Sequence, residues 1–208
     1  MKVIAIVSRK GGSGKSTIAI HLAVAANLAG KETAIIDLDP QSSAAKWSDS
    51  RSSEFPVVVS AQASRLEKVL EAAAKEGADL VFIDTSPHTE TAALAAIRAA
   101  DLILVPCRPS IVDLRAIDDT IDLIKLAKKT SVAAAVLNGV PPQGSLGDEA
   151  VEAIAGYGIA VAPVKIGHRS AFVRSLTDGL TAIEYEPKGK AAKEINALYK
   201  WTCTQVKV

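Results

Sequence analysis

Residues 3–17 read V-I-A-I-V-S-R-K-G-G-S-G-K-S-T, and this stretch decides the fold. Its first five residues are apolar and mostly β-branched, which favours a strand that is buried on both faces. Three glycines follow between residues 11 and 14, and Lys15 and Ser16 open a helical stretch. Glycine accepts positive φ, so backbone N–H groups can converge on an anion, and the positive end of a helix adds to the attraction. The stretch therefore predicts a strand, a phosphate-binding loop and a helix.

The remainder of the chain alternates short apolar runs with longer amphipathic stretches. Strands are expected at residues 3–7, 33–36, 57–60, 80–83, 102–105, 132–137 and 160–164. Helices are expected at residues 16–28, 64–75, 89–100, 111–129, 147–157, 170–177 and 190–206. Ser64, with Glu67 three residues later, forms a capping-box pattern. Strict alternation implies right-handed crossovers, so we predict one doubly wound, mostly parallel sheet with helices on both faces, the P-loop NTPase architecture, as a single domain over 1–208. Its ligand should lie at the carboxyl ends of the strands.

Composition excludes several other classes of protein. The chain has 208 residues, and its hydrophobic fraction of 49% excludes global disorder. It has no apolar run long enough to span a bilayer and no signal-peptide pattern, so the cytoplasm is the expected compartment. Two distant cysteines, Cys107 and Cys203, are too few for a disulfide scaffold or a zinc ribbon. A net charge of +1 disfavours nucleic-acid binding through bulk charge, although it leaves room for a local basic patch.

The glycine loop departs from the strict phosphate-loop pattern, which requires glycine where Arg9 stands. The physical requirements are still met, because Lys15 can reach the β- and γ-phosphates, the Ser16 hydroxyl can bind Mg²⁺ and Thr17 can contact the α-phosphate. An ordinary glycine-rich turn is the alternative, and the Lys-Ser pair at the helix start disfavours it. The expected nucleotide-binding residues of the loop are Gly11, Gly12, Ser13, Gly14, Lys15, Ser16 and Thr17.

Residues 10–16, K-G-G-S-G-K-S, closely resemble the deviant Walker A motif of the ParA/MinD family of ATPases. On the residues alone, Lys10 could be an ordinary solvated loop lysine. The resemblance implies instead that Lys10 crosses a dimer interface to the phosphates bound by the other subunit. It also implies ATP and Mg²⁺ as cofactors and an ATP-dependent homodimer.

Three carboxylates follow predicted strands. Asp37 and Asp39 stand in D-L-D-P-Q, and Asp84 ends L-V-F-I-D, the Walker B form that binds Mg²⁺ through water. The D-x-D-P-Q segment also matches the resembled family. That match implies that Asp39 orients or deprotonates the attacking water, and that Asp37 holds either the Mg²⁺ shell or the switch loop. His88, beyond the Walker B strand, is interpreted as an exposed loop residue, and His21 as a packed or capped one.

The resemblance covers almost the whole chain. Leu137-Asn138-Gly139 resembles the strand end whose Asn138 reads the adenine, and residues 105–114 resemble a loop near the dimer face and the partner-protein site. Residues 169–195 are similar to the family's C-terminal segment. The chain starts at the first strand, without an N-terminal helix-turn-helix, so it resembles the small class of partition and positioning ATPases.

Three outputs fit such an ATPase: non-specific DNA binding with a cargo-bound partner, membrane binding of the MinD type, or carriage of a metal cluster. Residues 165–208 carry eight basic and four acidic side chains, which favours DNA and a nucleoid-associated protein. The expected DNA contacts are Arg169, Arg174, Lys188, Lys190 and Lys193. The implied partner is a ParB- or ParG-like protein, or another cargo adaptor, that stimulates hydrolysis. The last residues lack an apolar stripe, which disfavours the MinD-like alternative, and the two distant cysteines disfavour a cluster.

Overall fold

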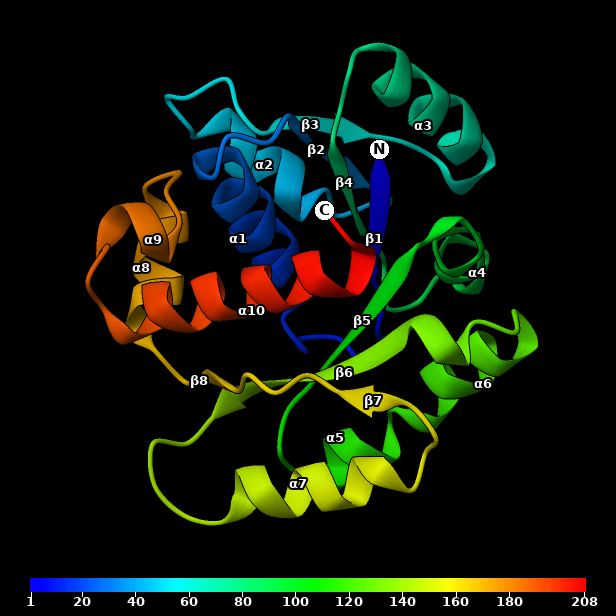
Figure 1. The fold of residues 1–208 in the computed structure, drawn as a ribbon, viewed down its shortest axis with the longest axis vertical. Helices are drawn as coiled ribbons and strands as arrows, with labels where there is room; N and C mark the ends of the chain where they lie inside the picture. The colour runs from blue at the N-terminus through cyan, green and yellow to red at the C-terminus, as the bar shows by residue number, and fades with distance from the viewer.

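The computed structural model describes all 208 residues and confirms the predicted sheet (Figure 1). Seven of the eight strands run in the order β3-β2-β4-β1-β5-β6-β7. The eighth, β8, pairs with the later part of β6, past the point where β7 pairs with it, and every pairing is parallel. The strands are β1 (Lys2–Ile6), β2 (Thr33–Asp37), β3 (Val57–Ser60), β4 (Leu80–Asp84), β5 (Leu102–Cys107), β6 (Ala133–Val140), β7 (Ala160–Val161) and β8 (Ile166–Gly167). The central strands β1, β2, β4 and β5 are almost wholly buried, as continuous apolar runs require.

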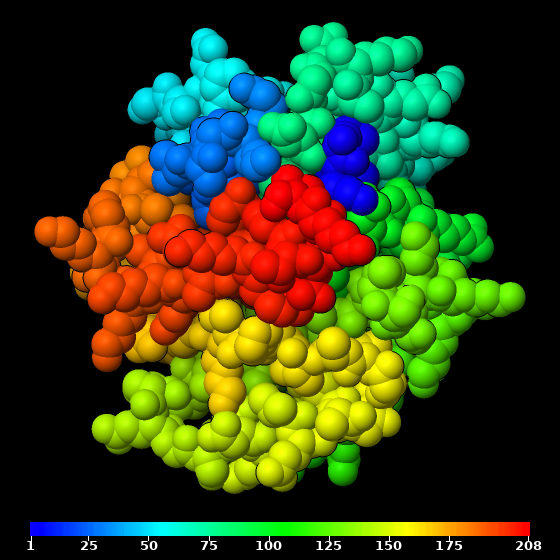
Figure 2. Space-filling view, in the orientation of Figure 1, coloured from blue at the N-terminus to red at the C-terminus, as the bar shows by residue number.

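Helices cover both faces of this sheet and close two apolar cores. The α-helices are α1 (Lys15–Leu28), α2 (Ser43–Asp49), α3 (Leu66–Lys75), α4 (Glu90–Ala99), α5 (Ile111–Arg115), α6 (Asp118–Leu126), α7 (Leu146–Ala155), α8 (Ser170–Thr177), α9 (Ala182–Tyr185) and α10 (Lys190–Val206). Residues of α1, α2 and α8–α10 fill one core, and residues of α3–α7 fill the other. Figures 1 and 2 show α10 crossing the front of the molecule beside α1. None of these helices is long and apolar enough to cross a membrane.

The sequence interpretation was wrong at four places. The single helix expected over 111–129 is two helices, because the backbone tightens where the Ile117 N–H donates to Leu114 O, three residues back. The predicted Ser64 cap does not form, since residues 63–65 make a 3₁₀ turn and α3 starts only at Leu66. Of the strand expected over 160–164, only the first two residues form a strand, β7, and the next strand, β8, begins at Ile166. The serine-rich segment after Asp39, where no helix was expected, contains α2.

His21 lies in the middle of α1 and is fully buried, as the packed interpretation predicted. Its Nδ1 faces Thr17 O at 2.7 Å, and its Nε2 accepts the Ala182 N–H at 3.0 Å. Nε2 therefore carries no proton, and the ring is neutral. Burial lowers the pKa of His21 to about 4, although Thr17 O and Glu184 oppose the shift. This histidine joins the helix after the glycine loop to the start of α9.

The stability of the protein should therefore depend on pH through His21. In the unfolded chain the imidazole binds a proton below about pH 6.5, whereas the folded protein excludes it down to about pH 4. The contribution of His21 to stability is thus fully present above about pH 6.5 and is lost as the pH drops toward 4, by about 2 kcal/mol between pH 7.5 and pH 5. Asp84, whose pKa burial raises to about 7, contributes in the opposite direction, so the effect of His21 is read as the difference between wild type and His21→Gln. Denaturant unfolding of wild type and His21→Gln at the two pH values measures this difference. His88 is exposed and supplies the control, because the stability of His88→Gln should keep the pH dependence of wild type. If the stability of all three proteins changes equally with pH, the attribution of this effect to His21 is wrong.

Candidate functional site

The glycine loop lies between β1 and α1, and its shape is fixed from outside by Asn138 at the end of β6. The Asn138 amide nitrogen donates to Ser13 O at 2.7 Å. Gly14 has a φ of 98°, and a Cβ at this position would overlap that amide nitrogen. Gly14 is therefore required both by its backbone conformation and by the close approach of Asn138. This bracing contact was missed by the sequence reasoning, which expected Asn138 to read an adenine, and that role stays a prediction.

Lys15 begins α1 and points back into the loop. The residue is only 6% exposed, and its ammonium donates to Lys10 O at 3.2 Å. Burial lowers the pKa of Lys15, while the nearby carboxylates of Asp84 and Asp39 oppose that shift. A buried ammonium with one backbone partner is poised to receive an anion, because it has two further protons to donate.

A cavity of about 560 Å³ opens beside this ammonium. It is formed by the glycine loop, the starts of α1 and α2, and single residues of the loop after β4 and of α8. Its lining residues are Gly12, Gly14, Lys15, Ser16, Thr17, Ile20, Asp39, Ser43, Lys46, Trp47, Ser50, Pro87 and Leu176. Most of the loop residues predicted to bind nucleotide thus meet in one cavity at the carboxyl end of β1.

Asp84 ends β4 directly behind the loop, opposite Ile6 of β1 and Asp37 of β2 in the sheet register. Both of its carboxylate oxygens are buried and accept no hydrogen bond. Burial raises the pKa of Asp84 to about 7; Asp37 and Asp39 add to this, whereas Ser16 and Lys15 oppose it. Buried carboxylate oxygens without donors fit a hard cation that shares its coordination with phosphate and water. The structure contains no cluster of three or more His, Cys, Asp or Glu side chains able to hold a metal by itself.

Asp37 ends β2, and its carboxylate is engaged by backbone groups. Oδ1 accepts the Asp39 N–H at 2.9 Å, and Oδ2 accepts the N–H groups of Ala44 and Ala45 at 3.0 and 3.2 Å. Burial raises the pKa of Asp37, while these donors oppose the shift. Asp37 thus ties the end of β2 to the first turn of α2. Both roles considered from sequence, the Mg²⁺ shell and the switch loop, stay predictions.

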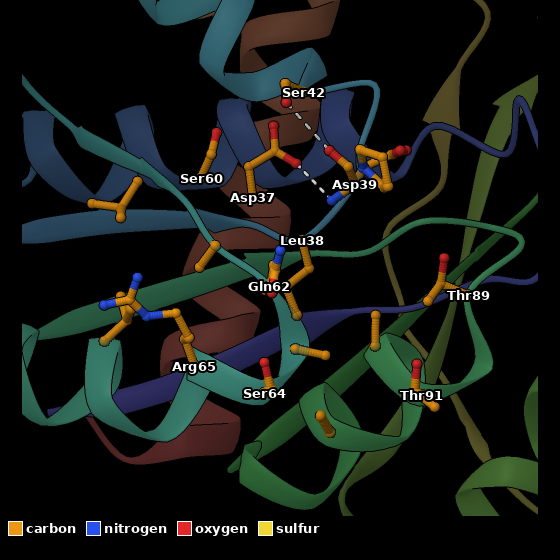
Figure 3. Close-up of a pocket in the computed structure, with 17 residues that line it drawn as sticks. Asp37, Leu38, Asp39, Ser42, Ser60, Gln62, Ser64, Arg65, Thr89 and Thr91 are labelled. Atoms are coloured by element: carbon orange, nitrogen blue, oxygen red, sulfur yellow. Dashed lines mark hydrogen bonds between the residues drawn. The ribbon is translucent and has the colours of Figure 1, made fainter.

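Asp39 stands between two hollows of the surface. Besides the cavity at Lys15, it lines a second cavity of about 1130 Å³ between β3, the 3₁₀ turn and the start of α4 (Figure 3). Its Oδ1 accepts the Gln41 N–H at 2.9 Å, and its carbonyl accepts the Ser42 N–H at 2.8 Å. A half-buried carboxylate beside the buried ammonium and open to solvent can orient a water toward a bound phosphate.

Lys10 does not line either cavity. Its ammonium lies 3.7 Å from Asp113 Oδ1 on α5. The neighbouring Ile111 and Val112 are 71% and 68% exposed. The side chain thus lies on an outer face, next to two apolar residues that nothing in the chain covers.

The predicted DNA-contacting residues divide into two groups. The Arg169 guanidinium pairs with Glu194 at 2.7 Å, and Glu194 also accepts the Gly167 N–H, so Arg169 joins β8 to α10. The remaining four are exposed and carry no ion pair: Arg174 on α8, Lys188 before α10, and Lys190 and Lys193 on α10. His88 is exposed, as expected.

Comparisons with known proteins agree with the fold. The family model described as the CobQ/CobB/MinD/ParA nucleotide binding domain matches residues 4–182. The maintenance of carboxysome distribution protein A of Gloeobacter kilaueensis is 35% identical over 206 residues, which covers 96% of this chain and 91% of that protein. Among solved structures, McdA of Cyanothece has a TM-score of 0.78 at 17% identity, covering 97% of this chain and 99% of that one. The MinC:MinD complex of Aquifex aeolicus gives 0.80 at 19% identity, with coverage of 98% and 96%.

Proposed function

Because this chain belongs to the CobQ/CobB/MinD/ParA nucleotide-binding family, we propose that it is a Mg²⁺-dependent ATPase that positions a cargo inside the cell, with residues 1–208 as one ATPase domain. Two features of the site carry the proposal: the buried Lys15 ammonium at the glycine loop, and the nearby Asp84 carboxylate, whose buried oxygens accept no hydrogen bond. The similarity to carboxysome-distribution proteins over nearly the full length of both chains favours a protein-shelled compartment over a plasmid as the cargo.

The loop residues divide the chemistry between them. Backbone N–H groups of residues 11–15 and the Lys15 ammonium hold the β- and γ-phosphates, and Thr17 contacts the α-phosphate. The Ser16 hydroxyl and Asp84 hold Mg²⁺, which neutralises charge on the phosphate oxygens when it is bound. Asp39 orients the attacking water, while Asp37 keeps Asp39 in place through the hydrogen bond to its N–H. Asn138 holds the loop in shape through Ser13 and can face the base with its free oxygen.

ATP binding should build a homodimer in which Lys10 of each chain reaches the partner's phosphates. Support comes from the position of Lys10 outside its own cavity and from the exposed Ile111 and Val112 beside it. Apolar residues of this kind are expected in the core of an interface, with charged residues around them. The cis ion pair with Asp113 would then have to open before Lys10 can cross.

Lys10→Ala should keep ATP binding and lose the ATP-dependent dimer. The side chain lies outside the cavity, so its removal breaks only the ion pair with Asp113 within one chain and leaves the cavity lining unchanged. The trans contact with phosphate, in contrast, disappears. Light scattering with and without ATP measures the mass, and a fluorescent ATP analogue measures the affinity. Lys68→Ala, an exposed lysine on α3, is the matched control. If the Lys10 variant dimerises with ATP as strongly as wild type does, Lys10 makes no essential trans contact and is an ordinary solvated loop lysine.

The dimer would bind DNA without sequence preference through Arg174, Lys188, Lys190 and Lys193, which are exposed and unpaired, with Arg169 behind them. A ParB- or ParG-like protein or another cargo adaptor would stimulate hydrolysis and release the protein from the nucleoid. The apolar residues of α10, such as Leu198 and Val206, are buried against the sheet, so this helix offers no apolar face to a membrane.

Binding to random-sequence duplex DNA in three nucleotide states, with phosphate release measured in parallel, tests the function. Association that requires ATP and weakens with salt is expected, and Lys190→Glu with Lys193→Glu should weaken it while sparing ATP binding. Lys68→Glu combined with Lys75→Glu, at two exposed positions of α3, is the charge-matched control. If the protein releases phosphate but binds DNA in none of the three states, the proposed ATPase activity stands and the proposed DNA binding is wrong. Binding to liposomes with anionic lipid would then test the MinD-like alternative. No nucleotide binding would overturn the proposal.

A further inference from the structure

The position of Asp39 depends on α2, the helix that follows it. The Asp39 N–H and the first N–H groups of α2 share the two oxygens of Asp37. The carbonyl of Asp39 also accepts the Ser42 N–H directly before α2 at 2.8 Å. The Ser42 hydroxyl donates to the same carbonyl at 3.4 Å (Figure 3). A shift of α2 would therefore move the Asp39 backbone with it. α2 has only seven residues and cannot hold its place by helix propensity alone.

The far end of α2 is anchored by Arg51, whose side chain is only 5% exposed. Its guanidinium makes a two-pronged contact with Glu184, at 2.7 and 3.0 Å, and also donates to Gly179 O and Phe55 O at 3.0 and 2.9 Å. The same guanidinium stacks over Trp47 of α2, 5.0 Å from the ring centroid. Trp47 in turn donates from Nε1 to Leu180 O at 3.2 Å.

The anchor is itself rigid. Glu184 accepts the N–H and the hydroxyl of Thr181 in the capping box of α9. Burial raises its pKa, but the Arg51 guanidinium and the Thr181 donors outweigh burial and hold the pKa below its usual range. A Cβ at Gly179 would overlap the carbonyl of Ser50, so the end of α2 and the segment before α9 touch backbone to backbone. His21 fastens the Ala182 N–H to α1.

We propose that Arg51 is a positioning residue that holds Asp39 at the cavity through α2, by clamping the end of α2 to Glu184 and Gly179. Its contribution to catalysis rests on the proposed ATPase function; its effect on the Asp39 segment does not. Lysine cannot replace it, because a single ammonium cannot satisfy the carboxylate and the Gly179 carbonyl with the geometry of a planar fork.

Arg51→Lys, which keeps the charge, tests the proposal. We expect the hydrolysis rate at saturating ATP to fall roughly tenfold, because small misplacements of a positioning group have effects of this order. The affinity for a fluorescent ATP analogue should change much less than the rate, because the loop and Lys15 are untouched and α2 forms only one wall of the cavity. Amide exchange should accelerate at residues 39–45 and stay unchanged in α1. Arg98→Lys, an exposed arginine on α4, is the matched control.

A second variant guards against the objection that the first merely unfolds. Arg51→Met combined with Glu184→Gln removes both charges, so that no unpaired buried charge remains. It should reproduce the exchange and rate changes at a temperature well below its unfolding transition. Unchanged exchange at residues 39–45 and an unchanged rate in both variants would overturn the proposal. If wild type hydrolyses no ATP, the proposed function fails, and the exchange result alone then decides whether Arg51 holds the Asp39 segment.

Discussion

Lys15→Ala is expected to lower the affinity for ATP by at least about 100-fold. Its ammonium is buried beside the loop and has one partner, Lys10 O, so most of its hydrogen-bonding capacity is available to phosphate. A hydrogen bond to a charged group contributes about 1.5–3 kcal/mol, and two such bonds to phosphate oxygens correspond to about two orders of magnitude in affinity. The loss also leaves the carboxylates of Asp84 and Asp39 without their nearest opposing charge.

Titration with a fluorescent ATP analogue, at a fixed Mg²⁺ concentration, measures this effect. Lys68→Ala removes an exposed lysine from α3 and should bind as wild type does. Thermal unfolding without nucleotide checks that the Lys15 variant is folded. Normal affinity in a folded Lys15→Ala protein would contradict the assignment of the phosphate loop.

Asp39→Ala should slow hydrolysis by roughly 10²–10⁴-fold, the range expected when a positioned acid–base group is lost. ATP binding should persist, because the carboxylate contacts solvent between the two cavities and makes no hydrogen bond to the glycine loop. The variant should therefore accumulate as the ATP-bound dimer and stay on DNA. The backbone N–H that bonds to Asp37 is retained, so the loop keeps its main anchor.

Single-turnover experiments measure the expected loss of hydrolysis. The mass of the protein in the presence of ATP shows whether the ATP-bound dimer accumulates. Asp122→Ala, on the exposed side of α6, is the control and should turn over normally. Wild-type turnover in Asp39→Ala would exclude water positioning by this residue. We expect Asp39→Ala to slow hydrolysis more than Arg51→Lys does. Such a result would fit a direct role of Asp39 in the reaction and an indirect role of Arg51, which holds Asp39 in position.

Much of the fold follows from short-range patterns in the sequence. Buried parallel strands are continuous apolar runs, and each of the predicted runs is found in the sheet. The helices over 170–177 and 190–206 have the predicted bounds, since their apolar residues recur at the helical period and face one core. The prediction failed where a helix is fixed by distant partners. Nothing in the serine-rich sequence of α2 indicates that Asp37 caps it or that Trp47 is buried beneath Arg51.

The chemical groups of the site could be predicted from sequence patterns: the glycine loop, Lys15 and Ser16 at the helix start, and carboxylates after buried strands. These features are local, because a strand end and the next helix start are covalently joined and their geometry depends on a few neighbouring residues. Which side chains are already engaged in contacts became visible only in the folded protein. Asn138 braces Ser13, Arg169 is paired with Glu194, and Arg51 reaches Glu184, a residue 133 positions away. Such pairings depend on how the chain folds back on itself, and no periodicity in the sequence encodes them.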